Sequence, residues 1–391
     1  MQTQTAERFR PFGTTIFAEM SRLALEHNAV NLSQGFPDFD GPDFVKQAAV
    51  DAIHAGHNQY ARSPGVPSLA DAIKKRFTER TGLDIDALAQ VTVTSGCTEA
   101  IAAALLGTVN PGDEVILFEP YYDSYRACIA MTGATPRFVS MKPNNGRFIF
   151  DEANLAAAFS DKTRAILLNT PHNPSGTVLT RAELQTIAKL CTKHDAIALS
   201  DEVYEDLTYD REHISIASMP GMAERTITLS SLGKSFSLTG WKVGWAIASP
   251  ELSAAVRSAH QFITFSTATP FQHAAATALT EGNAYVSKLR EQYRTARDML
   301  AEGLADVGFD VTLPEGTYFI LAEHSKISSR LGVSTDVELS LKLTSEFGVA
   351  AIPPSVFCAT PGLCADYLRF AFCKQQSTLE EAISRLNKIN G

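Results

Sequence analysis

Residues 229–245, LSSLGKSFSLTGWKVGW, combine a hydroxyl group and two amines between two apolar runs. Ser231 lies three residues before Lys234, and Lys242 follows eight residues after it. Partial burial favours the neutral, nucleophilic form of a lysine amine, which Schiff-base chemistry requires. The hydroxyl and the second cation could hold a phosphate. This segment therefore indicates pyridoxal phosphate, which carries an aldehyde and a phosphate, although a surface loop with ordinary lysines is the alternative.

A second candidate site lies at residues 94–100, TSGCTEA, where a strand gives way to a helix. Gly96 suits the turn, and the first helical turn offers the backbone amides of Gly96, Cys97 and Thr98. The helix start and the helix dipole together favour an anion. An ordinary capped turn is the alternative interpretation.

Polar side chains follow two further strands. NTPHNPSG, at 169–176, holds Asn173 between two prolines, where its amide could bind a phenolate oxygen or a carboxylate. SDEVYE, at 200–205, places Asp201 at the end of an apolar run, where a carboxylate needs a partner. A protonated pyridine nitrogen would supply one, and Tyr204 could reach the hydroxyl of the same ring. A proline-rich turn and a capping acid are the alternatives.

Aromatic and cationic residues complete the set of candidates. Tyr121 and Tyr122 follow another strand, and one of them could stack on a flat ring or serve packing alone. Arg369 stands inside the apolar run YLRFAF, where it would suit a carboxylate or an internal salt bridge. Tyr60, in a loop, is only weakly indicated. The nine histidines show no metal-ligand spacing, so we expect no metal site.

Short apolar runs alternate with amphipathic helical patterns from about residue 90. Helices are expected from Cys97, at 121–133 and at 181–195, the last with Thr180 as its cap. This α/β alternation predicts a mostly parallel sheet with helices on both faces, and ligands of such a sheet bind at the carboxyl ends of its strands. The expected strands are 91–94, 114–118, 164–169, 196–201, 226–230 and 243–249.

The pattern changes after residue 283. A long charged helix is expected at 284–308, then a strand at 317–324, a helix ending at Gly348, a strand at 367–373 and a helix at 378–389. We therefore predict three parts. Residues 1–40 form an N-terminal arm that joins the small domain or the cleft, 41–283 a large domain that binds the cofactor, and 284–391 a small α+β domain.

The composition argues against several classes of protein. The chain has 391 residues, 45% of them hydrophobic and 20% charged, which is enough to bury a large core. A net charge of −9 argues against nucleic acid or an anionic membrane as a partner. Six scattered cysteines indicate reduced thiols and a cytoplasmic protein. The polar N-terminus does not resemble a secretory signal, and no apolar run is long enough for a membrane span.

Together these motifs resemble the class I aminotransferases, which are fold-type I enzymes that use pyridoxal phosphate, and the resemblance covers essentially the whole chain. The methionine and kynurenine aminotransferase subgroup is the most similar, on NLSQGFPDFDGP (31–42), NTPHNPSG, SDEVYE, TGWKVGW and AIPPSVFC (351–358). The resemblance implies a large domain with a mostly parallel seven-stranded sheet between helices, and a smaller α+β domain. It also implies a homodimer with shared active sites.

The same resemblance implies a role for each candidate. Lys234 would form the Schiff base, and Asp201 would pair with the pyridine nitrogen. Tyr204 and Asn173 would hold the phenolic oxygen of the ring, and Tyr122 would stack on the ring. The phosphate would bind Gly96, Cys97, Thr98, Ser231, Lys242 and Tyr60 of the partner subunit. The substrate would contact Arg369 through its α-carboxylate, together with Asn173, Gly35 and Phe17.

Two positions depart from the pattern of the family. Lys242 stands where many members have arginine, so a point charge would replace a bidentate fork on the phosphate. Cys97 stands where alanine or glycine is frequent, and its side chain would matter little if the backbone makes the contact.

We expect a ping-pong transamination in which Lys234 also acts as the base that moves the α-proton. Residues 260–270, HQFITFSTATP, contain no arginine or lysine for a distal carboxylate. Aromatic residues favour methionine, phenylalanine, tyrosine, tryptophan, kynurenine or glutamine-like donors over aspartate. These residues are Phe17, Tyr60, Tyr122, Phe262, Phe265 and Phe357.

Three other functions stay open as alternatives. One is β-elimination on cysteine S-conjugates, which needs the same carbanion and a leaving group. Another is an aspartate-type aminotransferase. The third is a cofactor-binding regulator without turnover, which would usually carry a basic DNA-binding segment that residues 1–40 lack.

Overall fold

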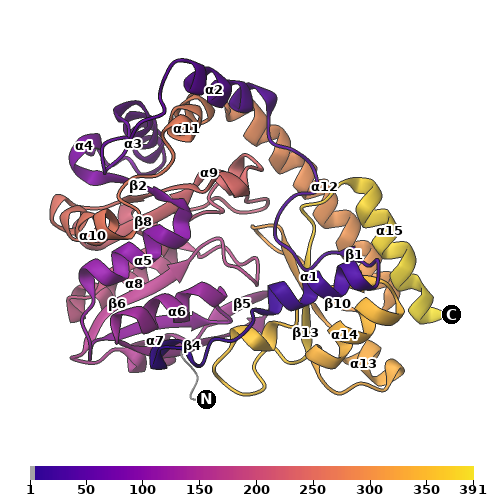
Figure 1. The fold of residues 1–391 in the computed structure, drawn as a ribbon. Helices are drawn as coiled ribbons and strands as arrows, with labels where there is room; N and C mark the ends of the chain where they lie inside the picture. The colour runs from indigo at the N-terminus through magenta and orange to yellow at the C-terminus, as the bar shows by residue number, and fades with distance from the viewer. Residues whose placement is uncertain (1–4) are drawn as a thin grey trace.

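The computed structural model describes residues 5–391, and its centre is one large sheet with helices against it (Figure 1). Eight strands lie in the order β2-β9-β8-β7-β6-β3-β4-β5. Six of them run parallel to one another, whereas β9 and β5 run the opposite way. In chain order the strands are β2 Val91–Ser95, β3 Glu114–Glu119, β4 Thr135–Asn144, β5 Arg147–Phe150, β6 Thr163–Asn169, β7 Ile197–Asp201, β8 Thr226–Ser231 and β9 Val243–Ile247.

The mostly parallel sheet predicted from the sequence is confirmed, and the six expected strands match to within two residues at each end. The sheet nevertheless has eight strands rather than seven, because β4 and β5 form an antiparallel hairpin at one edge. The expected strands omit this hairpin since Pro136 and Pro143 weaken its strand pattern. Its sequence signal is the Asn145-Gly146 turn, in which both residues have positive φ, 49° and 77°.

Alternate side chains of β3 show how helices cover both faces of the sheet. Val115 and Leu117 pack into the same core as α5 (Gly96–Thr108) and α6 (Asp123–Thr132). Ile116 and Phe118 point to the other face and pack with α8 (Arg181–His194). Thr180 caps α8 through a capping box with Glu183, as the sequence predicts. The sheet is therefore the middle layer of three.

The end of the sheet formed by β2 and β9 has its own helical cover. Here α2 (Asp43–His54) and α3 (Pro67–Thr81) pack with α11 (Thr269–Glu281), while α10 (Pro250–Ile263) lies against α5. Three shorter helices lie in the connections between these elements: α4 Ala87–Gln90, α7 Glu152–Ala158 and α9 Leu232–Ser235.

The C-terminal part begins with the long helix α12 (Asn283–Val307), close to the expected 284–308. A three-stranded antiparallel sheet follows, formed by β10 (Asp310–Thr312), β11 (Phe319–Glu323) and β13 (Tyr367–Ala371). Three helices complete this part: α13 Ser325–Leu331, α14 Asp336–Glu346 and α15 Gln376–Leu386. The helix expected to end at Gly348 is α14, and it stops two residues earlier.

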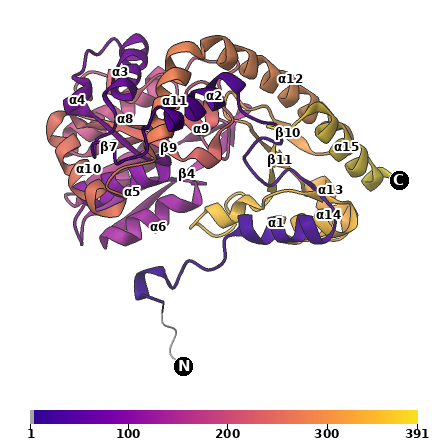
Figure 2. The same ribbon diagram turned by 45° about the horizontal axis from the view of Figure 1, so that its top comes forward.

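The N-terminal segment packs against the C-terminal part of the chain. Its helix α1 (Ile16–Glu26) lies beside α14 (Figure 2), and β1 (Val30–Asn31) pairs in parallel with β12 (Val349–Ala350). The domain boundaries at residues 40 and 283 stay predictions, and residues 1–4 of the predicted arm lie outside the described residues. Within residues 5–391, no helix is both long and apolar enough to cross a membrane.

Candidate active site

A cavity of about 370 Å³ lies at the carboxyl ends of the central strands, between the large sheet and the C-terminal part. Of the residues to which the resemblance gives a role at the cofactor or the substrate, every one lines this cavity except Tyr60. These residues are Phe17, Gly35, Gly96, Cys97, Thr98, Tyr122, Asn173, Asp201, Tyr204, Ser231, Lys234, Lys242 and Arg369. Segments more than 300 residues apart in the sequence thus meet at one site. Its position agrees with the expectation that ligands of such a sheet bind at the carboxyl ends of the strands.

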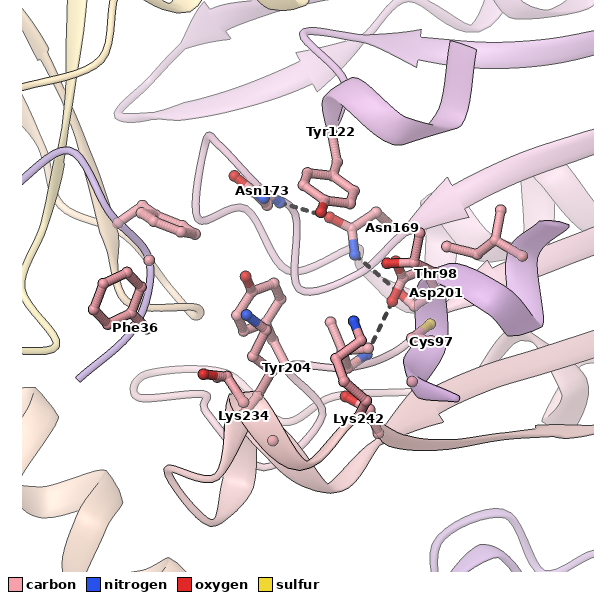
Figure 3. A pocket seen from close by; sticks show the side chains of 18 of the residues that line it. Phe36, Cys97, Thr98, Tyr122, Asn169, Asn173, Asp201, Tyr204, Lys234 and Lys242 are labelled. Atoms are coloured by element: carbon pink, nitrogen blue, oxygen red, sulfur yellow. Dashed lines mark hydrogen bonds between the residues drawn. The ribbon is translucent and has the colours of Figure 1, made fainter. Parts of the chain in front are cut away.

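Lys234 lies just after β8, in the short helix α9, and extends into the cavity (Figure 3). Its Nζ donates a 2.9 Å hydrogen bond to the hydroxyl of Tyr318. The same nitrogen lies 5.7 Å and 5.5 Å from the ring centres of Tyr204 and Tyr318. Desolvation lowers the pKa of Lys234 to about 8, so much of its amine is neutral in mildly alkaline solution.

Asp201 ends β7 and is buried, with 4% of its surface exposed. One carboxylate oxygen accepts a 2.6 Å hydrogen bond from Tyr125, and the other accepts a 3.2 Å bond from the amide of Val203. Burial raises the pKa of Asp201, and these donors act against that rise. The thiol of Cys97 also acts against the rise in the pKa of Asp201, so this side chain has an effect at the site that the sequence did not show.

Asn169 and Asn173 stand at the end of the neighbouring strand, β6. The amide of Asn169 donates to the backbone oxygen of Asp201 at 3.0 Å and accepts from the backbone nitrogen of Asn173 at 2.7 Å (Figure 3). These bonds fix the loop after β6 to the end of β7. The side chain of Asn173 is thereby held in the cavity, next to Arg369.

The start of α5 has the features of an anion site. Gly96 has a φ of 76°, and no side-chain cap satisfies the first amides of this 13-residue helix within the described chain. Lys242 reaches over this turn, because a Cβ built on Gly96 would lie 3.1 Å from its Nζ. On the other side, a Cβ on Gly244 would lie 2.6 Å from the amide nitrogen of Cys97. Uncapped amides, a helix dipole and an ammonium group therefore meet at one point.

Arg369 is 1% exposed and lines the same cavity as this helix start. It donates from Nη1 to Asn173 Oδ1 at 3.1 Å and from Nη2 to the backbone oxygen of Ser33 at 2.8 Å. Its Nε is buried without a hydrogen-bond partner among residues 5–391. Burial lowers the pKa of Arg369 to about 10. A buried guanidinium with a spare donor suits a carboxylate ligand.

The aromatic residues predicted from the sequence divide into two groups. Phe17 and Tyr122 line the cavity, and Phe357 stacks on Phe17 with the two ring centres 5.7 Å apart. Tyr60, Phe262 and Phe265 lie outside the cavity of this chain. Tyr60 packs edge-on against Phe265, with the two ring centres 5.5 Å apart. Their exposed fractions are large: Tyr60 85%, Phe262 86% and Phe265 46%.

The sequence analysis missed two tyrosines that contact the central groups, Tyr125 on Asp201 and Tyr318 on Lys234. The available signal for Tyr125 is its position one helical turn after Tyr122. For Tyr318 the signal is weaker, because it only precedes the buried strand β11.

Comparison with known proteins identifies the class. The chain belongs to the class I and II aminotransferase family, whose family model matches residues 27–386. It is similar to the probable N-succinyldiaminopimelate aminotransferase DapC of Mycobacterium tuberculosis, with 46% identity over 98% of each chain. The solved structure of the Mycobacterium tuberculosis N-succinyldiaminopimelate aminotransferase superposes with a TM-score of 0.96 over 98% of this chain and 100% of that one.

Two further relatives lie in the subgroup that the motifs indicated. The methionine aminotransferase of Escherichia coli is 42% identical over 96% of each chain. The kynurenine–oxoglutarate transaminase of Dictyostelium discoideum is 41% identical over 97% of this chain and 94% of that protein. The chain is thus an aminotransferase of the class that the sequence predicted.

The cofactor of this family is pyridoxal phosphate, and the cavity fits it. The uncapped start of α5 with Lys242 suits the phosphate, and the buried carboxylate of Asp201 suits a pyridinium nitrogen. The amine of Lys234, with its lowered pKa, suits the aldehyde. The residues that line this cavity therefore offer a partner for the phosphate, the ring nitrogen and the aldehyde of the cofactor.

Proposed function

We propose that this aminotransferase acts on amino acids with an uncharged aromatic or sulfur-containing side chain, such as methionine, phenylalanine, tyrosine or kynurenine. The observation that carries this proposal is the set of cations at the cavity. Among the described residues, three cationic side chains line it: Lys234, Lys242 and Arg369. If they serve the aldehyde, the phosphate and the α-carboxylate, the described residues that line the cavity offer no other cation for a distal carboxylate.

The walls around the substrate position support the same proposal. Phe17, Phe36, Tyr122 and Phe319 line the cavity, and the ring of Phe319 lies 4.1 Å from the guanidinium carbon of Arg369. Aromatic walls beside a carboxylate-binding arginine favour an apolar side chain on the bound amino acid.

We assign the chemical roles to the residues at the cavity. When bound, the cofactor supplies an aldehyde that condenses with amines and a ring that accepts electrons. Lys234 Nζ would hold the aldehyde of the bound cofactor, and the same amine, when free, would take and return the α-proton of the substrate. The ionised carboxylate of Asp201 would keep the ring nitrogen protonated, while Tyr204 and Asn173 would hold the oxygen on the ring. Arg369 and Asn173 orient the substrate by its α-carboxylate.

We also propose that the enzyme is a homodimer in which Tyr60 of the partner subunit reaches the phosphate. The exposure of Tyr60, Phe262, Ile263 and Phe265 supports this proposal, because such a group of exposed apolar side chains is typical of an interface. Light scattering at micromolar concentration tests it, and a monomeric mass would contradict it.

A panel of donors tests the substrate proposal. Methionine, phenylalanine, kynurenine, glutamine, aspartate and N-succinyldiaminopimelate would each be paired with 2-oxoglutarate and with pyruvate. We expect kcat/KM for methionine or phenylalanine to exceed that for aspartate about a hundredfold, since an unpaired carboxylate in an apolar pocket is costly. A preference for aspartate would overturn the proposal.

N-succinyldiaminopimelate is included because a relative that is 46% identical carries its name. Its distal carboxylates would need a cation other than the three that line the cavity. A clear preference for N-succinyldiaminopimelate would overturn the proposal of aromatic and sulfur-containing substrates. We would then expect the cation that binds its distal carboxylates to come from the partner subunit. Release of pyruvate and ammonia from a cysteine S-conjugate, without an added oxo acid, would reveal β-elimination.

A further inference from the structure

Tyr318 links Lys234 to the N-terminal segment of the chain, which lines the cavity at Gly35. Its hydroxyl accepts the 2.9 Å hydrogen bond from Lys234 Nζ and donates a 2.5 Å hydrogen bond to the backbone oxygen of Gly35. The ring is 1% exposed and is held edge-on by Tyr204 and Phe319, with ring centres 5.2 Å and 4.8 Å away. The hydroxyl therefore has a fixed position between the amine and the wall.

The direction of these two bonds is set by chemistry. A backbone oxygen can only accept, so the single proton of the Tyr318 hydroxyl must point to Gly35. Tyr318 can therefore offer only a lone pair to Lys234, and the amine must donate. A neutral amine that donates one N–H keeps its own lone pair free, which is the state that a nucleophile or a base requires.

Gly35 is needed for this arrangement. A Cβ at this position would lie 2.6 Å from Cζ of Phe319 and 3.2 Å from Cε2 of Tyr318, so a larger residue would displace both rings. The same segment is held by Arg369 through the oxygen of Ser33 and by Lys374 through the oxygen of Phe36, the latter at 2.7 Å. Three side chains thus bind this segment: Arg369, Lys374 and Tyr318. Of these, Tyr318 is the one that also forms a hydrogen bond with Lys234.

The charged and titratable groups around Lys234 act on the amine in both directions. Cys373 and Asp201 favour its charged form, whereas Lys242 and Arg369 disfavour it. Desolvation is the largest effect and also favours the neutral amine. The oxygen of Tyr318 is a hydrogen-bond acceptor within this group, and an acceptor stabilises an ammonium more than an amine.

We propose that Tyr318 is a positioning residue for the reacting amine. It accepts a hydrogen bond from Lys234 and leaves the lone pair of the amine free. Through its own bond to the backbone oxygen of Gly35, it fixes the position of the amine relative to the N-terminal segment. This inference rests on the proposed role of Lys234. Tyr318 itself takes and gives no proton in the reaction, because its own proton stays on the bond to Gly35.

The test is the pH dependence of Lys234 labelling in the full-length protein after the cofactor has been removed. Acetic anhydride modifies neutral amines, and mass spectrometry of the peptide that contains Lys234 gives the extent at each pH from 6 to 10. We expect a midpoint near the pKa of about 8 for the native sequence. In Tyr318→Phe the lost acceptor should move the midpoint about 0.5 to 1 unit lower.

Tyr293→Phe is the matched control. Tyr293 is also 1% exposed and packs edge-on against Tyr318 at 5.9 Å, but its hydroxyl has no hydrogen-bond partner in the described part of the chain. Its removal should leave the midpoint unchanged. An unchanged midpoint in Tyr318→Phe, or an equal shift in Tyr293→Phe, would overturn the inference.

Two further variants show whether a negative result concerns the role of Lys234 or only the role of Tyr318. If Lys234→Ala keeps full turnover, the proposed role of Lys234 is wrong. If that variant is inactive but the midpoint in Tyr318→Phe does not move, only the role of Tyr318 is wrong. Should Tyr318→Phe fail to fold, Gly35→Ala displaces the same ring and should lower the midpoint in the same direction; an unchanged midpoint there counts against the inference.

Discussion

The phenol of Tyr125 donates a 2.6 Å hydrogen bond to the carboxylate of Asp201, with both side chains buried. Burial alone favours the neutral carboxylic acid, which could not hold a proton on a pyridine nitrogen. The phenol acts in the opposite direction, because a donor stabilises the ionised form. Tyr125 therefore helps Asp201 to stay charged in a place that disfavours charge.

Tyr125→Phe should weaken catalysis through this carboxylate. A hydrogen bond to a charged group contributes about 1.5 to 3 kcal/mol, so we expect kcat/KM to fall at least about tenfold. The pKa of Asp201 should rise further, and the acidic limb of the pH profile should move to higher pH. Steady-state kinetics from pH 5 to 9 measures both effects. An acidic limb that stays in place would contradict the role given to Tyr125.

Arg369→Lys should separate binding of the carboxylate from the rest of the reaction. Lysine keeps the charge but loses the fork and the bond to Asn173, so kcat/KM for methionine should fall about a hundredfold. The amine that lacks the α-carboxylate, 3-(methylthio)propylamine, should react equally slowly with both proteins in single-turnover assays. A similar loss for this amine would mean that Arg369 does not act on the carboxylate.

Gly244→Ala should weaken cofactor binding. The added Cβ would lie 2.4 Å from the carbonyl carbon of Gly96 and would push the start of α5 out of place. We expect the Kd for pyridoxal phosphate, measured by fluorescence titration, to rise about a hundredfold, since several charge-assisted bonds depend on this turn.

Gly240→Ala is the control for that substitution. It lies in the same segment, and its added Cβ would meet nothing within 4 Å. Its Kd should match that of the native protein. Equal affinities for all three proteins would show that the start of α5 does not bind the phosphate.

The sequence predicted the strands and the strand-end residues because both depend on local patterns. Apolar runs define β6, β7 and β8; Asp201 ends β7, and Asn173 and Lys234 follow β6 and β8 within a few residues. The hairpin of β4 and β5 was missed because its prolines and exposed positions interrupt the strand pattern.

The two tyrosines were missed for a different reason. Tyr125 and Asp201 are 76 residues apart, Lys234 and Tyr318 are 84 apart, and Tyr318 and Gly35 are 283 apart. No local pattern records such pairs, since they form only when α6, the segment before β11 and the N-terminal segment come together in the folded chain. The residues at the strand ends are therefore easier to predict than the side chains that contact them from distant parts of the chain.

The central claim is that Lys234 is the amine that binds the cofactor aldehyde. Reduction of the native protein with borohydride in the presence of pyridoxal phosphate, followed by peptide mapping, tests it directly. We predict one stoichiometric cofactor adduct on Lys234 and loss of the yellow absorbance on reduction. An adduct on Lys242 or another lysine instead, or a protein that stays colourless and unmodified, would contradict the account.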